Sequence, residues 1–110
     1  MDKIMMAVGT SMLLLKLLEK WDMYGYQMIK ELEARSESVF SLKEGTLYPL
    51  LHTLELQGDI ESFEQPAPTG RIRRYYRITP DGRKTLTGKK EEWKTYEKAV
   101  NLVLGGVSHA

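Results

Sequence analysis

The chain has 110 residues, a formal net charge of +1 and no cysteine. That length supports one domain with one modest core, and the lack of cysteine excludes disulfides, thiolate catalysis and cysteine-ligated metal. The two histidines, His52 and His109, lie far apart in the sequence, so no zinc site is expected. A membrane-spanning helix needs roughly 20 largely uncharged residues in a row. The sequence contains no such stretch, so no membrane span is predicted. We expect a soluble, cytoplasmic protein that needs no cofactor.

Charge is unevenly distributed along the chain. Residues 19–64 contain ten acids and four bases, whereas residues 70–84 contain six bases and one acid. Clustered cations release condensed counterions when they meet phosphates, so the second segment predicts contact with nucleic acid. The alternative is a solvated, arginine-rich hairpin that binds no ligand.

The N-terminal part of the chain predicts two helices. Apolar side chains recur at three- and four-residue intervals over residues 5–20. Gly9 weakens a helix by up to about 1 kcal/mol relative to alanine, so the helix can begin nearer Thr10. Its apolar surface is wide enough for two contacts, and we expect the second one to be with another subunit. A break at residues 22–26 precedes the second helix, and a polar connection at 36–38 follows it.

A third helix is predicted from the spacing of Ser41 and Glu44, which is that of a capping box. Pro49 lacks an amide hydrogen and its ring presses on the carbonyl of Gly45, which predicts a bent or loosely formed first turn. A Gly-Asp pair at 58–59 ends the helix. One face is apolar at helical spacing and consists of Leu47, Leu50, Leu51 and Leu54.

The rest of the chain predicts a hairpin and a long helix. Residues 60–64 and 71–79 form strands around a loop at 65–70. Thr79 is a capping residue before a proline, so a helix begins at Pro80 and runs to about Leu104. Its apolar seam is heptad-like and would be an unusually large exposed patch on a monomer, which predicts a dimer. The predicted interface residues are Leu15, Leu86, Trp93, Tyr96, Val100 and Val103, and Val107 continues the seam.

Three helices followed by a hairpin predict a winged helix-turn-helix: a mainly α fold with a small β-hairpin and a long C-terminal dimerisation helix. The residues resemble the PadR-like transcriptional regulators from about residue 10 to residue 93. The matching pieces are Tyr24-Gly25-Tyr26, Glu44 to Leu51, Leu54-Glu55, Gly58, Gly70-Arg71 and Arg74 to Thr79. The resemblance implies a homodimeric repressor of a palindromic operator. Residues 1–79 would form the DNA-binding domain, and residues 80–110 the dimerisation helix with a short tail.

The expected DNA contacts follow from this fold, in which the third helix enters the major groove and the wing touches the neighbouring backbone or minor groove. For the tyrosines at 24 and 26, phosphate binding at a helix N-terminus competes with capping of the core. For Tyr48 the alternative is packing beside the wing, and Arg77 can instead form a structural ion pair. The predicted DNA-binding residues are Tyr24, Tyr26, Lys43, Thr46, Tyr48, His52, Arg71, Arg73 and Arg74.

Trp93 resembles in position a tryptophan of multidrug-sensing relatives, whose two copies line a pore at the dimer centre. The resemblance implies a site for a small aromatic effector, multidrug-like or phenolic, and methionine and tryptophan suit varied planar molecules. A packed dimer core without space for a ligand is the alternative. The expected lining residues are Met5, Val8, Met12, Trp93 and Glu97.

Two other classes of function compete with DNA binding. A winged-helix module that binds protein, without sequence-specific DNA binding, fits the acidic body and the weakly charged third helix. No residues assemble an enzyme active site, because a histidine cluster, a glycine-rich phosphate loop and a buried carboxylate pair are all missing from the sequence.

Overall fold

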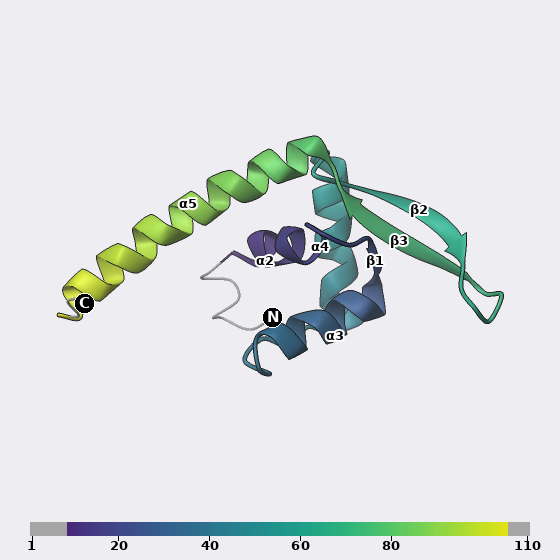
Figure 1. The fold of residues 1–110 in the computed structure, drawn as a ribbon, viewed down its shortest axis with the longest axis horizontal. Coiled ribbons are helices and arrows are strands. Elements are labelled where there is room, and N and C mark those ends of the chain that lie inside the picture. Colours follow the sequence, from purple (N-terminus) through teal and green to yellow (C-terminus); the bar gives the residue numbers. More distant parts are fainter. Residues whose placement is uncertain (1–8, 106–110) are drawn as a thin grey trace.

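The computed structural model describes residues 9–105, so the predictions for Met5, Val8 and Val107 lie outside the described residues. The described part has four helices and one three-stranded sheet, which confirms the predicted fold class. Figure 1 shows the hairpin and the last helix extending in different directions from the helical body. The elements are α2 (Thr10–Leu17), β1 (Met23–Tyr24), α3 (Gly25–Arg35), α4 (Glu44–Leu56), β2 (Ile60–Pro66), β3 (Ile72–Ile78) and α5 (Pro80–Val103).

Helix α2 is shorter than the sequence predicted. It begins at Thr10, because Gly9 has a φ of 86°, in the left-handed region that glycine tolerates. It ends at Leu17 rather than at Lys20. Leu14 and Leu15 are fully buried, so α2 lies at the centre of the core.

The predicted capping box at Ser41 is wrong. Helix α4 begins at Glu44, and its N-cap is Lys43, which has extended backbone angles (φ −106°, ψ 159°) and makes no side-chain cap bond. Leu42 explains the shift, because it is buried at 5% exposure. The backbone stays extended past Ser41 so that the Leu42 side chain reaches the core. The helix therefore begins at Glu44.

The connection between α3 and α4 is also longer than predicted and runs from Ser36 to Lys43. The backbone amides of Glu37 and Ser38 donate to the carbonyls of Ala34 (3.2 Å) and Glu33 (2.8 Å). This is the Schellman pattern, which turns the chain away from a helix end.

Pro49 does not loosen the start of α4. The amide of Leu47 donates to the Lys43 carbonyl at 2.9 Å, and the helix continues to Leu56. Pro49 and Gly45 are both exposed. Water can therefore hydrogen-bond the Gly45 carbonyl that Pro49 leaves without a donor. The predicted end of the helix is confirmed by Gly58, which has a φ of 81°.

The hairpin carries a third strand that the sequence did not predict. The sheet is antiparallel in the order β1-β3-β2, and Tyr24, Tyr75 and Phe63 face one another across it. With only two residues, β1 is too short to show the alternation that marks a strand. We call β2, β3 and the turn between them the wing.

The junction between the wing and α5 is tightly packed. Thr79 Oγ1 accepts a hydrogen bond from the Gly82 amide (3.0 Å), which confirms the predicted helix start. It also donates to the Gly58 carbonyl at 2.6 Å. A Cβ on Gly82 would collide with the carbonyl of Asp59 and lie 2.8 Å from Ile78 Cγ1. The wing and α5 therefore meet at a position where any residue other than glycine would displace the backbone.

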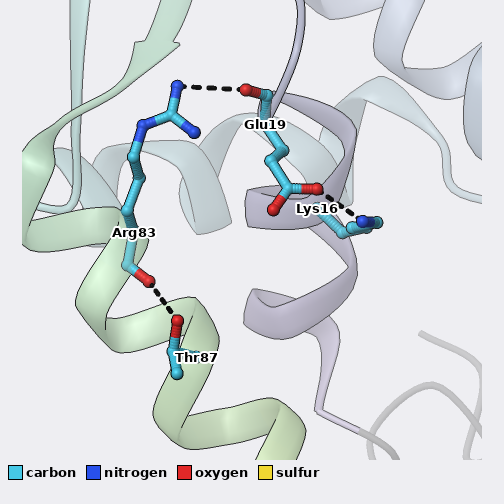
Figure 2. A network of polar contacts seen from close by, with 4 residues as sticks. All are labelled: Lys16, Glu19, Arg83 and Thr87. Carbon is cyan, nitrogen blue, oxygen red and sulfur yellow. Dashed lines mark hydrogen bonds and ion pairs between the residues drawn. The ribbon is translucent and has the colours of Figure 1, made fainter.

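Figure 2 shows the polar contact that joins α5 to the end of α2, with two contacts between near neighbours in the chain. Arg83 on α5 donates through Nη2 to the carbonyl of Glu19, just past the end of α2, at 3.0 Å. Thr87 donates to the Arg83 carbonyl at 3.1 Å. The Glu19 carboxylate pairs with Lys16, and this hydrogen bond lowers the pKa of the Glu19 carboxyl. The hydrogen bond from Arg83 to Glu19 and the burial of Leu86 fix the first half of α5 against the body.

Candidate nucleic-acid interface

The two faces of β3 carry different chemistry. Successive residues of a strand point to opposite sides of the sheet. Tyr76 and Ile78 are buried against the helices, and burial raises the pKa of the Tyr76 phenol. Arg73, Tyr75 and Arg77 alternate with these residues and so lie on the opposite, outer face. The wing therefore has a core face and an outer face that is cationic and aromatic.

Three rings form a row across the outer face, which we call the outer aromatic row (Tyr24, Tyr75 and Phe63). Tyr24 meets Tyr75 edge to face with centroids 5.5 Å apart, and Phe63 stacks on Tyr75 at 5.7 Å. An arginine covers each end of the row: the guanidinium carbon of Arg73 lies 4.2 Å from the Tyr24 centroid, and that of Arg77 lies 4.3 Å from the Phe63 centroid. The row is not among the residues predicted from the sequence, although the alternation of residues 73, 75 and 77 is a signal for it.

Two of the wing arginines are paired with acids. Arg77 lies 3.3 Å from Asp22 and 3.6 Å from Glu61, which confirms the structural ion pair considered for it. Arg74 lies 3.6 Å from Glu64. Its Nη1 also donates to Ser62 Oγ at 2.9 Å, and the Ser62 hydroxyl donates in turn to Glu55 on α4 at 2.7 Å. Arg74 thus ties the wing to α4.

Arg71 and Arg73 are different. Neither has an acid within ion-pairing distance anywhere in residues 9–105. Arg71 is exposed beside the turn of the hairpin, and Arg73 is half-buried over Tyr24. The positive charge that remains available on the wing therefore comes from these two residues.

The outward face of α4 lies beside the start of α3. Tyr48 is 42% exposed, yet a Cβ on Gly25 would lie 2.8 Å from its Cζ. The ring therefore packs on the α3 start while part of it faces solvent, and contact of Tyr48 with DNA stays a prediction. His52 and Lys43 are exposed, and Thr46 is half-buried.

At the α3 start, Tyr24 is the N-cap residue, and its amide donates to Gln27 Oε1 at 3.4 Å. Tyr26 is 51% exposed, with Lys30 lying 5.5 Å from its ring centroid. The fold thus gathers Tyr24, Tyr48 and Arg73 around the α3 start. Arg71 is left at the hairpin tip.

The predicted effector and dimer residues lie around α5. Met12 is buried, Glu97 is exposed, and Trp93 is half-buried against the core with its ring 5.7 Å from that of Tyr96. Leu15 and Leu86 are buried within the single chain. A contact with a second subunit would therefore use the part of the seam that is exposed or half-buried, which consists of Trp93, Tyr96, Val100 and Val103.

Other kinds of site find no support in the described part of the chain. Residues 9–105 hold no cluster of three or more histidine, aspartate or glutamate side chains that could bind a metal ion. Over the same residues, no helix combines the length and the apolar character needed to cross a bilayer.

The fold and the cationic wing beside an exposed α4 face define a winged helix-turn-helix protein. Comparison with known proteins gives the family. The profile of the "Transcriptional regulator PadR-like family" matches residues 14–88. A transcriptional regulator of Mycobacterium tuberculosis is 42% identical over 88 residues, which cover 80% of this chain and 76% of that protein.

Solved structures agree with this assignment. A transcriptional regulator from Clostridium thermocellum superposes with a TM-score of 0.81 at 33% identity, covering 91% of this chain and 96% of that one. A PadR family regulator from Clostridium difficile gives 0.75 at 38% identity, covering 86% and 96%. The chain belongs to the PadR-like family of transcriptional regulators, which are DNA-binding proteins and not enzymes.

Proposed function

We propose that this protein is a homodimeric repressor that acts in the cytoplasm and binds a palindromic operator through α4 and the wing. The observation that carries this proposal is the pair of arginines, Arg71 and Arg73, for which residues 9–105 provide no acid partner. They stand on a wing next to the exposed face of α4 that holds Tyr48 and His52. Unpaired cations near a protruding helix face suit phosphates beside a groove.

A second subunit is part of the proposal because of α5. Its C-terminal half exposes Tyr96 (56%) and Val103 (86%) with nothing in the described chain to cover them. Pairing two such helices would bury the seam. It would also place two α4 helices to enter successive major grooves, roughly 34 Å apart, as in other dimeric helix-turn-helix proteins. Residues 1–79 would then bind DNA, and residues 80–110 would hold the dimer.

The salt dependence of duplex binding tests the role of the wing. Replacing Arg71 and Arg73 by alanine removes two phosphate contacts per subunit. The slope of log K against log[salt] should therefore become shallower by about 2 per subunit. Fluorescence anisotropy with a labelled duplex between low and moderate salt measures this slope.

The matched control is Arg35→Ala with Arg77→Ala. This variant also loses two positive charges per subunit, but both belong to arginines that are paired with acids. Arg35 pairs with Glu31, and Arg77 pairs with Asp22 and Glu61. We expect this control to keep a slope close to that of the wild type. Equal slopes for the two double variants would remove the wing arginines from the mechanism.

We also propose that a small aromatic effector binds between the subunits near Trp93. The half-buried indole and its neighbour Tyr96 offer ring faces, and Glu97 one turn further along favours a cation. The effector would act by binding two dimer states with different affinity. Titration with a planar cationic aromatic should quench tryptophan fluorescence in the wild type and not in Trp93→Ala. Quenching that survives this substitution unchanged would point to Trp21, which is 68% exposed.

The second candidate function is a protein-binding winged-helix module. The cross-strand acids Glu61 and Glu64 favour it, because they offset part of the charge of the wing. A gel shift with random duplex at low salt separates the two candidates. A duplex that is retarded by the protein supports DNA binding. A duplex that runs as it does without protein supports the protein-binding module.

A further inference from the structure

We propose that Tyr24 is a positioning residue, which fixes the guanidinium of Arg73 for contact with duplex DNA and does not touch the duplex itself. This inference rests on the proposed function, because it assigns a task to Tyr24 within the same interface. It also replaces the direct phosphate contact that the sequence suggested for Tyr24.

The backbone of Tyr24 is held from two sides. Tyr24 pairs with Tyr75 between β1 and β3, and its amide donates to Gln27 Oε1 as α3 begins. It is thus the residue at which the sheet becomes the helix. A ring attached there has a defined place relative to both α3 and the wing.

The ring of Tyr24 contacts two side chains on the outer face of the wing. Tyr75 makes an edge-to-face contact with it at 72° between the ring planes, and the guanidinium of Arg73 lies over the ring at 4.2 Å. Tyr24 is also half-buried. These contacts commit the ring to neighbours within the chain, whereas Tyr26, two residues further along, is 51% exposed.

The kind of partner decides which groups of an arginine guanidinium remain free to bind a phosphate. Arg77 donates to the Asp22 carboxylate at 3.3 Å, whereas Arg74 donates to the Ser62 hydroxyl at 2.9 Å and has the Glu64 carboxylate 3.6 Å away. These hydrogen bonds use donor edges of the guanidinium, and the carboxylates offset its charge. A ring instead meets the flat face of the guanidinium and leaves the charge and the in-plane N–H donors free. Arg73 is therefore held in place and still able to donate to a phosphate.

Holding the side chain matters because a long arginine loses rotamer freedom when it is fixed by a ligand. A guanidinium that is already stacked has lost part of that freedom before the duplex arrives. Preorganisation of this kind strengthens binding without adding a contact. An exposed cation–π contact is worth enough to change affinity by about two- to fivefold.

The test uses a fluorescently labelled mixed-sequence duplex of 30 base pairs, because phosphate contacts dominate binding to such a probe. Tyr24→Phe keeps the ring and should bind within twofold of the wild type. Tyr24→Leu removes the ring and should bind about two- to fivefold more weakly. Arg73→Ala should weaken binding, and adding Tyr24→Leu to it should cause no further loss.

Phe63→Leu is the matched control for loss of a ring from the sheet. Phe63 stacks on Tyr75 as part of the same outer aromatic row, but its arginine is Arg77 rather than Arg73. We expect this variant to keep the affinity of the wild type. Equal weakening in Phe63→Leu and Tyr24→Leu would mean general loosening of the sheet and would overturn the proposal.

A readout that needs no DNA follows the guanidinium directly. In the wild type, Tyr24→Phe and Phe63→Leu, the NMR signal of Arg73 Hε should be shifted upfield by the ring above which it lies. In Tyr24→Leu the signal should return to the ordinary arginine range. An Arg73 Hε signal that does not respond to loss of the ring would refute the positioning role.

The remaining outcomes are also decisive. Equal weakening in Tyr24→Phe and Tyr24→Leu would show that the hydroxyl contacts DNA. A further loss on adding Tyr24→Leu to Arg73→Ala would show that Tyr24 acts independently of Arg73. If the wild type itself fails to bind the duplex at low salt, the proposed function fails, and that result is distinct from a failure of the positioning role alone.

Discussion

The wing and the C-terminal half of α5 both protrude from the body, but they are stabilised in different ways (Figure 1). On the wing, Arg73 and Arg77 stack on rings, and Arg74 and Arg77 pair with acids across the strands. At the end of α5, Leu102 and Val103 are exposed with no cover from the described residues. Charged groups are stable in water alone, whereas a continuous apolar face is not. The wing is therefore stable in water without a ligand, whereas the exposed end of α5 fits the proposed contact with a second subunit.

The largest expected effect comes from spoiling the apolar seam. Val100→Glu with Val103→Glu places two charges where the second subunit would pack, so the dimer should dissociate. Analytical ultracentrifugation should show half the mass. Affinity for a duplex with two half-sites should fall by about 10²-fold or more, because the second half-site is no longer linked to the first.

Thr95→Glu with Asn101→Glu is the control for this variant, since it adds the same charge to α5 away from the seam. We expect it to remain dimeric. Dissociation of both double variants would indicate that the added negative charge, and not disruption of the seam, separates the subunits.

The junction between the two regions gives the next effect. Gly82→Ala drives a methyl group into the Asp59 carbonyl, where backbone must move. We expect a loss of about 1–3 kcal/mol in the free energy of unfolding. Denaturant titration monitored by circular dichroism measures this loss.

Gly88→Ala is the matched substitution in the same helix. Nothing lies within 4 Å of a Cβ at that position. Because alanine favours a helix over glycine, stability should rise by up to about 1 kcal/mol. If both substitutions shifted stability in the same direction, the close approach of Gly82 to Asp59 would not matter energetically.

The smallest effect concerns the paired charges of the wing. Glu64→Gln frees Arg74 from its acid and should raise the affinity for duplex at low salt by about twofold, since exposed ion pairs are weak. Glu61→Gln removes the same charge from the same strand, but Arg77 keeps Asp22 as a partner. Equal rises in the two variants would show a general charge effect with no special role for Arg74.

Much of the fold could be predicted because its signals are local. Apolar spacing gave the helices, and Thr79 followed by Pro80 set the start of α5. Ser41 misled because a capping pattern is also local, whereas the burial of Leu42 depends on the packed core. Strand β1 was missed because two residues carry no periodicity and are ordered only by pairing with β3.

The amino-acid sequence by itself determined the family, the order of elements and the cationic character of the hairpin, since each depends on residue types at short spacing. Only the tertiary structure decided which arginines remain unpaired. Asp22 lies far from Arg77 in the chain, as Tyr24 does from Arg73, and folding brings each pair into contact. Electrostatic and ring contacts act over a few ångströms of space, whatever the separation along the chain. For that reason the four arginines of one segment have different partners, and they differ in how much of their positive charge is available to bind a phosphate.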